Sequence, residues 1–320
     1  MTTALPPGYR WRPPTLDDVT EAVAVENAEA VALIGVPLVS EEWQRSQWTM
    51  PGFVLEENAA LVIAADGRIA GTLLVESAPP HRTVFQIGVV ADGHHGRGLG
   101  GALVDEGERR ARAMVALAGP GERVVLHMGT LADEPMVSSL LAGRGYVEVR
   151  RFSRMAITIE QAPAAPATLP GIVLRPAGDG ERSDVYRCLQ TSFEDHWGES
   201  QRDEAAWLHA HAEDETVWLA AVDGDRIVGA LVASPRSEED PEYGYIDQLG
   251  VVRSHRRRGI GRALLLESFC EFHRRGKHGV HLHVDTQSPT GATHLYERVG
   301  MASAPRFATW EKELRPASAQ

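Results

Sequence analysis

Residues 256–261 read Arg-Arg-Arg-Gly-Ile-Gly and combine residue types that suit the binding of a phosphate group. A strand-like run at 245–252 precedes them, and a helix-like run at 262–275 follows. Glycine lets the backbone turn tightly and leaves its N–H groups uncovered, while the first turn of a helix adds N–H groups with a positive partial charge. Arginine side chains can add charge-assisted contacts to the same anion. The stretch therefore predicts an anion cradle between a strand and a helix.

The cradle and its flanks also match a family motif. A strand ending in Leu-Gly-Val, followed by Arg/Gln-x-x-Gly-x-Gly/Ala, resembles the pyrophosphate loop of the GNAT acyltransferase superfamily, and here the match is Leu249–Val251 followed by Arg256–Gly261. Downstream, a strand-like run at 280–286 is followed by Ser288 and by Leu295-Tyr-Glu-Arg-Val-Gly-Met301, where the family commonly carries an Asn and then Leu-Tyr-x-x-x-Gly-Phe. The sequence departs from the motif at Ser288 and at Met301.

This resemblance implies that acetyl-coenzyme A is the acyl donor and that its pyrophosphate binds at the loop. The residues expected to bind the cofactor are Leu249, Gly250, Val251, Arg256, Arg257, Arg258, Gly259, Ile260, Gly261, Arg262 and Ser288. The fold implied is α/β (α+β), with two tandem GNAT domains, each a mixed, mostly antiparallel central sheet flanked by helices.

The chain carries the pattern twice. A strand-like run at 85–90, the loop His94–Gly100 and a helix-like run at 101–110 repeat the order of the later segments, and Asp-Gly hairpins at 62–71 and 219–229 precede them. A repeat of this size is a whole domain rather than a solenoid unit. We predict a first domain at 1–160, a Pro/Ala-rich linker at 161–170, and a second domain at 171–320.

Direct transfer of an acetyl group to an amine needs a base for the amine, an N–H donor for the oxyanion and an acid for the departing thiolate. The resemblance gives the acid role to Tyr296, and a backbone N–H near Val251 can stabilise the oxyanion. Asp247 is the expected base, because a carboxylate in an apolar strand is costly to bury away from a partner or a site.

Several alternatives stay open around this chemistry. His281, His283 and Asp285 alternate on one strand and would share one face, where they could serve as a base or a proton relay. The same histidines lack the converging ligands of a zinc site, so no metal is expected. The segment Phe193–Glu199 could form part of the acceptor pocket or be a solvated loop.

The first repeat keeps the glycines of the loop but differs at two positions. His95 stands in the place of Arg256, and Leu141 in the place of Tyr296. A leucine cannot protonate a thiolate, so the first domain is expected to be catalytically silent. A second coenzyme A site remains possible there, formed by Val90, His95, Gly96, Arg97, Gly98, Leu99 and Gly100.

Composition limits the remaining classes of function. The net charge of −12 argues against a nucleic-acid surface, and two cysteines in 320 residues indicate a reduced, cytoplasmic protein rather than a disulfide framework. No run is apolar enough to span a membrane, and the N-terminus lacks a signal peptide. We expect an N-acetyltransferase of a small-molecule amine, acting as a monomer or a homodimer.

Two other functions are compatible with the same residues. The tandem layout, with an active second half, also resembles mycothiol synthase, which acetylates a cysteinyl pseudo-disaccharide. A protein of another class, a non-catalytic acyl-coenzyme A sensor or scaffold, could use the same fold only to bind the ligand. The acceptor pocket is formed by variable segments, so the sequence does not name the acceptor.

Overall fold

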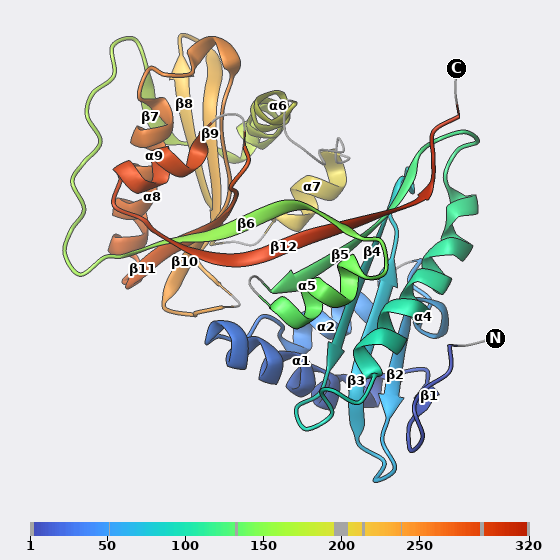
Figure 1. Cartoon of the computed structure of the whole chain (residues 1–320). Helices are drawn as coiled ribbons and strands as arrows, with labels where there is room; N and C mark the ends of the chain where they lie inside the picture. Colours follow the sequence, from blue (N-terminus) through green and yellow to red (C-terminus); the bar gives the residue numbers. More distant parts are fainter. Residues whose placement is uncertain are drawn as a thin grey trace. The chain divides into compact units, whose positions relative to one another are not determined.

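The computed structural model describes residues 3–50, 52–131, 134–194, 204–212, 215–237, 239–288 and 291–318. The chain divides into two compact units. Unit 1 comprises residues 1–151 together with 306–320, and unit 2 comprises residues 152–305. The chain can be followed through both in Figure 1, where colour runs from blue at the N-terminus to red at the C-terminus.

Unit 1 contains a mixed sheet with helices around it. Its strands lie in the order β1-β2-β3-β4-β5-β12, and in the pairings between them only β4 and β5 run parallel. The elements are β1 (Arg10–Arg12), α1 (Val19–Ile34), α2 (Glu41–Trp48), α3 (Leu55–Asn58), β2 (Ala59–Ile63), β3 (Ile69–Glu76), β4 (Thr83–Val90), α4 (Leu99–Met114), β5 (Val124–Leu131), α5 (Pro135–Ala142) and most of β12 (Ala302–Arg315).

Unit 2 repeats this arrangement. Its strands lie in the order β6-β11-β10-β9-β8-β7, and only the β10–β11 pairing is parallel. The elements are most of β6 (Val147–Thr158), β7 (Val173–Pro176), α6 (Arg182–Phe193), α7 (Glu204–Ala210), β8 (Val217–Asp223), β9 (Arg226–Ser234), β10 (Tyr243–Val251), α8 (Ile260–Arg274), β11 (Gly279–Asp285) and α9 (Ala292–Arg298). The predicted fold class, mixed and mostly antiparallel sheets flanked by helices, is confirmed.

The units differ from the predicted domain boundaries because each takes its last strand from the other repeat. Strand β6, at the end of the first repeat, pairs with β11 through residues 152–158. Strand β12, at the end of the chain, pairs with β5 through residues 307–315. In each unit, the strand at one end of the order is therefore distant in sequence from the strand with which it pairs. The Pro/Ala-rich segment 161–170 lies within unit 2.

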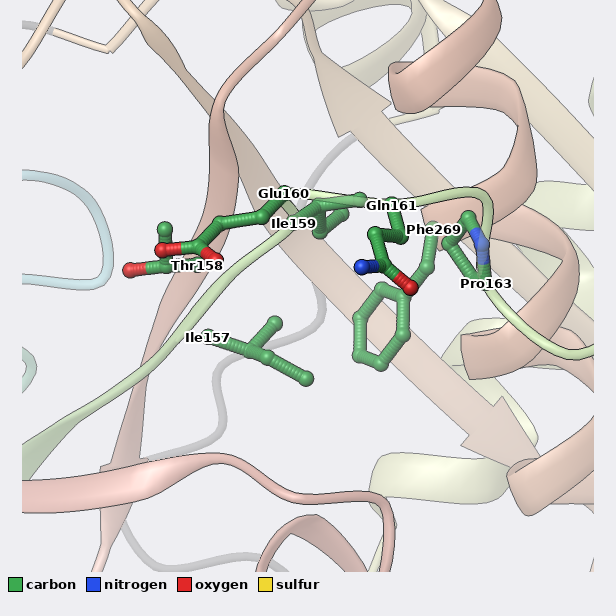
Figure 2. Close-up of a pocket in the computed structure, with 7 residues that line it drawn as sticks. All are labelled: Ile157, Thr158, Ile159, Glu160, Gln161, Pro163 and Phe269. Carbon is green, nitrogen blue, oxygen red and sulfur yellow. The ribbon is translucent and has the colours of Figure 1, made fainter.

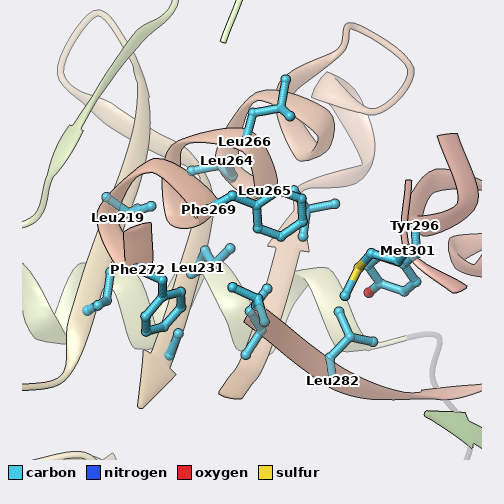
Figure 3. Close-up of a cluster of buried hydrophobic side chains, with 14 of the residues drawn as sticks. Leu219, Leu231, Leu264, Leu265, Leu266, Phe269, Phe272, Leu282, Tyr296 and Met301 are labelled. Atoms are coloured by element: carbon cyan, nitrogen blue, oxygen red, sulfur yellow. The ribbon is translucent and has the colours of Figure 1, made fainter. Parts of the chain in front are cut away.

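Alternating burial along the strands of unit 2 produces a core on each face of its sheet. On β9, Leu231 and Ala233 join the core beneath α8, whereas Ala230 and Val232 join the core beneath α6. This period of two is what an extended strand with two covered faces requires. Figure 3 shows the α8 core, in which Phe269 lies near Leu265 and the ring of Tyr296 lies beside Met301. The helices α8 and α6 are therefore held against opposite faces of the strands that carry the site.

Candidate active site

The predicted anion cradle joins β10 to α8. After a short 3-10 turn at Arg253–His255, the backbone enters the left-handed region at Arg257, with φ of 63°, and at Gly259, with φ of 84°. Gly259 is the N-cap of α8, whose first turn begins at Ile260. Left-handed residues that alternate with residues of negative φ curve the chain so that successive N–H groups point inward. The N-terminus of the helix adds its positive partial charge. The residues present therefore fit a pyrophosphate group.

Arg256 holds the cradle in position. Its Nε donates to the carbonyl oxygen of Val251 at 3.0 Å, and its Nη2 donates to the carbonyl oxygen of Ser192 at 2.8 Å. The same side chain thus ties the end of β10 to the last turn of α6. A Cβ on Gly250 would lie 2.7 Å from the Cβ of Ser192, so α6 approaches β10 as closely as a glycine allows. Sequence reasoning predicted a phosphate contact for Arg256 and did not predict these two bonds.

The other arginines of the cradle fall into two groups. Arg258 lies 3.5 Å from the carboxylate of Asp223, the last residue of β8, and so forms an ion pair within the protein. Arg257 and Arg262 are exposed and flank the N-terminus of α8. These two side chains are placed to add charge to an anion in the cradle.

The loop before α4 in unit 1 has the same backbone conformation as the cradle but different charged residues. Gly98 caps α4 with φ of 87°, and Gly96, with φ of 71°, corresponds to Arg257. His95 Nε2 lies 2.9 Å from the carbonyl oxygen of Val90, as Arg256 does from that of Val251. The same imidazole is 3.5 Å from Glu29, whose pKa is raised by burial and by nearby carboxylates. The loop at 95–100 thus differs in charge mainly because it has one arginine where the cradle at 256–261 has three.

The strand β10 has an irregularity at the predicted base. Its register against β9 shifts between Ile246 and Gln248, so Asp247 is the additional residue and its side chain is exposed. An extra residue of this kind bends a strand and redirects a side chain, which is frequent beside active sites. The side chain of Asp247 is exposed at this bulge, so the cost of burying a carboxylate does not support its role as the base, and that role stays a prediction.

The predicted oxyanion donor is a backbone N–H at the end of β10, near the cradle. The pairing of β10 with β11 extends from Tyr243 to Tyr245. Further along, Val252 N donates to Val228 O of the neighbouring β9 at 3.0 Å. Because successive N–H groups of a strand point to opposite sides, the N–H of Val251 points away from β9, on the β11 side of the strand. This is the position in which an acyl oxygen next to the cradle would need a donor.

Tyr296 lies in the α8 core beside Met301 (Figure 3). It is on α9, and burial raises the pKa of its hydroxyl to about 12. The hydroxyl therefore keeps its proton throughout the neutral range and is available as a hydrogen-bond donor there. In unit 1 the corresponding Leu141 is fully buried, and the tyrosine hydroxyl belongs instead to Tyr146, the counterpart of Met301. Ser288 lies in the turn between β11 and α9, where its N–H donates to Asp285 O.

The predicted histidine face exists and includes a residue that sequence reasoning missed. His281 and His283 lie on β11, and Glu239, in the loop before β10, is 3.0 Å from His283 Nε2. The ring of Tyr245 packs against that of His281 in a tilted arrangement, with 5.1 Å between the ring centroids. Local sequence pattern could not identify Glu239, because it lies more than forty residues before the histidines and meets them only in the folded chain. Most of the segment 193–199 lies outside the described residues.

A cavity of about 340 Å³ lies elsewhere in unit 2, between the end of β6 and α8 (Figure 2). Ile157, Ile159, Pro163 and Phe269 supply its apolar walls, and Thr158, Glu160 and Gln161 its polar rim. None of the predicted site residues lines it. Glu160 is the carboxylate in its lining, but the cradle, Asp247 and Tyr296 are not part of that lining, so the cavity is separate from the candidate site.

Comparison with known proteins decides the family. The model of the acetyltransferase (GNAT) family matches residues 23–125 and 182–301. The chain belongs to this family. It is an N-acetyltransferase that uses acetyl-coenzyme A as its acyl donor, and the family domain occurs twice in tandem, as the sequence predicted.

Individual relatives extend over nearly the whole chain. Mycothiol acetyltransferases from Cellulomonas flavigena and Nocardia farcinica are each 28% identical to it, covering 94% and 92% of this chain and 85% and 94% of their own lengths. A GCN5-related N-acetyltransferase from Sphaerobacter thermophilus is 30% identical, with a TM-score of 0.83 over 99% of both chains. A tandem GNAT protein from the clavulanic acid biosynthesis pathway, 17% identical with a TM-score of 0.72, shares the fold.

No helix among the described residues combines the length and the apolar character needed to cross a membrane.

Proposed function

We propose that unit 2 transfers the acetyl group of acetyl-coenzyme A directly to a primary amine of a small molecule. The observation that carries this proposal is the combination, within one unit, of the cradle at 256–261, the bulged Asp247 and the buried hydroxyl of Tyr296. In unit 1 the position of Tyr296 is a leucine, and β4 pairs with β3 without a register shift. The first repeat is accordingly proposed to be catalytically silent.

Each residue has a defined task in this proposal. Asp247 accepts the amine proton, directly or through water, because its carboxylate is exposed on the bulge. The N–H of Val251 stabilises the oxyanion, and Tyr296 donates a hydrogen bond to the departing sulfur. A tyrosine of pKa about 12 is a much weaker acid than a thiol of pKa about 8.5. Tyr296 thus keeps its proton and donates a hydrogen bond to the departing thiolate, and the thiolate takes its proton from solvent water after the C–S bond has broken.

Direct transfer is favoured over an acyl-enzyme on a cysteine. Burial raises the pKa of the Cys188 thiol to about 11, and the pKa of Cys270 is also raised, mainly by burial. A thiol that stays protonated at neutral pH is a poor nucleophile. The two substrates must then be bound together, which predicts intersecting rather than parallel lines in double-reciprocal plots of initial rate.

A second candidate function rests on the relatives. Enzymes named mycothiol acetyltransferase match more than nine tenths of this chain at 28% identity. The acceptor would then be a cysteinyl glycoside, whose amine is flanked by a thiol and a sugar. At this identity an enzyme for another amine remains equally compatible with the cradle and with Tyr296, since those residues handle the donor.

Rates measured with a panel of acceptors would distinguish the general amine acetyltransferase from the enzyme that acetylates a cysteinyl glycoside. Release of free thiol from acetyl-coenzyme A would be followed with the cysteinyl glycoside, simple amino acids, polyamines and aminoglycosides. The second candidate predicts a kcat/KM for the glycoside at least 100-fold above that for free cysteine; similar values for both would contradict it. Turnover of any primary amine that is lost in the Tyr296→Phe variant supports the general proposal, and turnover that is unaffected by that change contradicts it.

A further inference from the structure

Three potential metal ligands converge on the face of the unit 2 sheet that is opposite α8. Glu239, His281 and His283 each direct one donor atom toward the others, and these atoms all lie within 4.8 Å of one another. The shortest separations are 3.0 Å from Glu239 Oε1 to His283 Nε2 and 3.9 Å from Glu239 Oε2 to His281 Nδ1. Two ligands of one tetrahedral zinc ion are about 3.4 Å apart. Small side-chain rotations would therefore bring all three onto one ion.

A second set of contacts holds each of these ligands in place. Ser237 Oγ lies 2.6 Å from Nε2 of His281, and the hydroxyl of Tyr245 lies 3.5 Å from Nδ1 of His283. Arg154 donates to Glu239 Oε2 at 2.8 Å. Ring nitrogens and carboxylates that bind metals are usually oriented in this way through their other polar atom, which fixes the tautomer and the ring direction.

We propose that Glu239, His281 and His283 form a binding site for a divalent transition metal ion, with zinc as the first choice. Imidazole and carboxylate are both zinc ligands, and imidazole favours zinc and its transition-metal neighbours over magnesium or calcium. Three protein ligands leave a fourth position of a tetrahedral ion for water or another donor. His283 is the most exposed of the three, with 21% of its side chain accessible, so the ion enters from its side.

The cluster is largely enclosed by protein, since His281 is 1% exposed and Glu239 is 7% exposed. An ion bound there would be shielded from bulk water, so its attraction to these ligands would be stronger than at an exposed position. Arg154 donates to Oε2 of Glu239 and neutralises part of the carboxylate charge, whereas His283 faces Oε1. Oε1 is therefore the oxygen that would bind the ion. Asp285, two residues beyond His283 on the same face of β11, adds a negative charge near the ion.

The expectation that this chain has no metal site rested on finding only two histidines at alternate strand positions. The third ligand, Glu239, is more than forty positions before them in the sequence and comes from a loop. Only the folded chain brings it to the histidines.

Zinc binding to the full-length protein tests the proposal. After removal of metals with a chelator, the wild-type chain would be titrated with Zn²⁺ by calorimetry and, separately, with Co²⁺ by absorption spectroscopy. We expect one ion per chain and the visible bands of a four- or five-coordinate Co²⁺ site. The variants His283→Gln and Glu239→Gln should each weaken zinc binding by a factor on the order of 10–100 or more.

The control is His278→Gln. His278 lies 3.5 Å from Glu242 near the start of β11, so it forms a similar His–Glu pair at an exposed position. The His278→Gln protein should bind zinc with the wild-type affinity. Binding lost equally in all three variants, or Co²⁺ bound with the spectrum of the hexahydrated ion, would overturn the proposal.

A measurement on the wild type alone guards against variants that fail to fold. Zinc in excess of its Kd should raise the melting temperature of the wild-type chain, because an ion that binds only the folded state stabilises it. An unchanged melting temperature at 100 µM Zn²⁺, a concentration chosen at about 100 times a micromolar Kd, would contradict the site without reference to any variant.

Discussion

Two tyrosines show how the same local structure carries different chemistry in the two units. Met301 N donates to Tyr296 O at 3.1 Å, and Tyr146 N donates to Leu141 O at the same distance, so both pairs end their helices alike. The hydroxyl belongs to the first residue of the pair in unit 2 and to the second in unit 1. Sequence alignment of the repeats could predict this exchange, since it depends only on residue type at matched positions.

Tyr296→Phe should lower kcat on the order of 100-fold at pH 7, with little change in the KM for acetyl-coenzyme A. The ring stays in the core and only the hydroxyl is lost, so the melting temperature should change little. Steady-state kinetics would measure the effect. The matched control is Tyr146→Phe, which removes a buried hydroxyl from unit 1 and should leave kcat unchanged. Wild-type kcat in Tyr296→Phe would contradict the donor role.

Glu26 on α1 provides a test by pH. Burial raises its pKa to about 7, and the hydrogen bond with Thr72 opposes this only in part. The folded state therefore holds a proton that the unfolded chain releases near pH 4.5, and the free energy of unfolding falls as pH rises from 4.5 to 7. Glu26→Gln should stabilise the protein at pH 8 by on the order of 2 kcal/mol and less at pH 5. Urea unfolding at both values would measure it, and an equal effect at both would contradict the assignment.

At the scale of elements, the contact between α6 and β10 positions the cradle. Motif spacing predicted a glycine-rich loop between a strand and a helix, because that arrangement is local in sequence. It could not predict that Arg256 would bond to Ser192 O, or that Glu239 would reach β11, because those contacts join segments more than forty residues apart. The bulge at Asp247 was also missed, since a single extra residue leaves the apolar pattern of a short strand almost unchanged.

Gly250→Ala tests this contact. The added Cβ would lie 2.7 Å from the Cβ of Ser192, so α6 must move away from β10 or strain must be accepted. We expect a loss of about 1–3 kcal/mol in stability and a lower kcat/KM for acetyl-coenzyme A. Thermal unfolding and initial rates would measure both. Gly180→Ala, where a Cβ meets no atom within 4 Å, is the control and should change neither; a Gly250→Ala protein with wild-type stability would contradict the close approach.

At the scale of the whole molecule, the tandem arrangement was predictable because the repeats share their loops, hairpins and strand patterns. The exchange of β6 and β12 was not, because both final strands have similar alternating patterns and nothing local states which sheet each will join. The consequence is that truncation at the linker would remove a strand from each sheet. The two units therefore have to be tested within the full chain, by matched substitutions in one unit at a time.

The cradles offer such a matched pair in Gly259 and Gly98. Both are helix N-caps in the left-handed region, with φ of 84° and 87°, and a Cβ would lie 3.4 Å from Leu169 and 3.5 Å from Pro6, respectively. Replacement by alanine should cost each unit a similar 1–2 kcal/mol, roughly the penalty for a side chain in this region. Any difference in function then reports on which cradle serves the reaction.

The decisive measurement is kcat/KM for acetyl-coenzyme A in Gly259→Ala and in Gly98→Ala, with the acceptor saturating. If unit 2 binds the donor and carries the transfer, the value should fall at least about tenfold in Gly259→Ala, in line with the loss of a preorganised anion contact, and less than about twofold in Gly98→Ala. A larger loss in Gly98→Ala, or equal losses in both, would contradict the assignment of catalysis to unit 2.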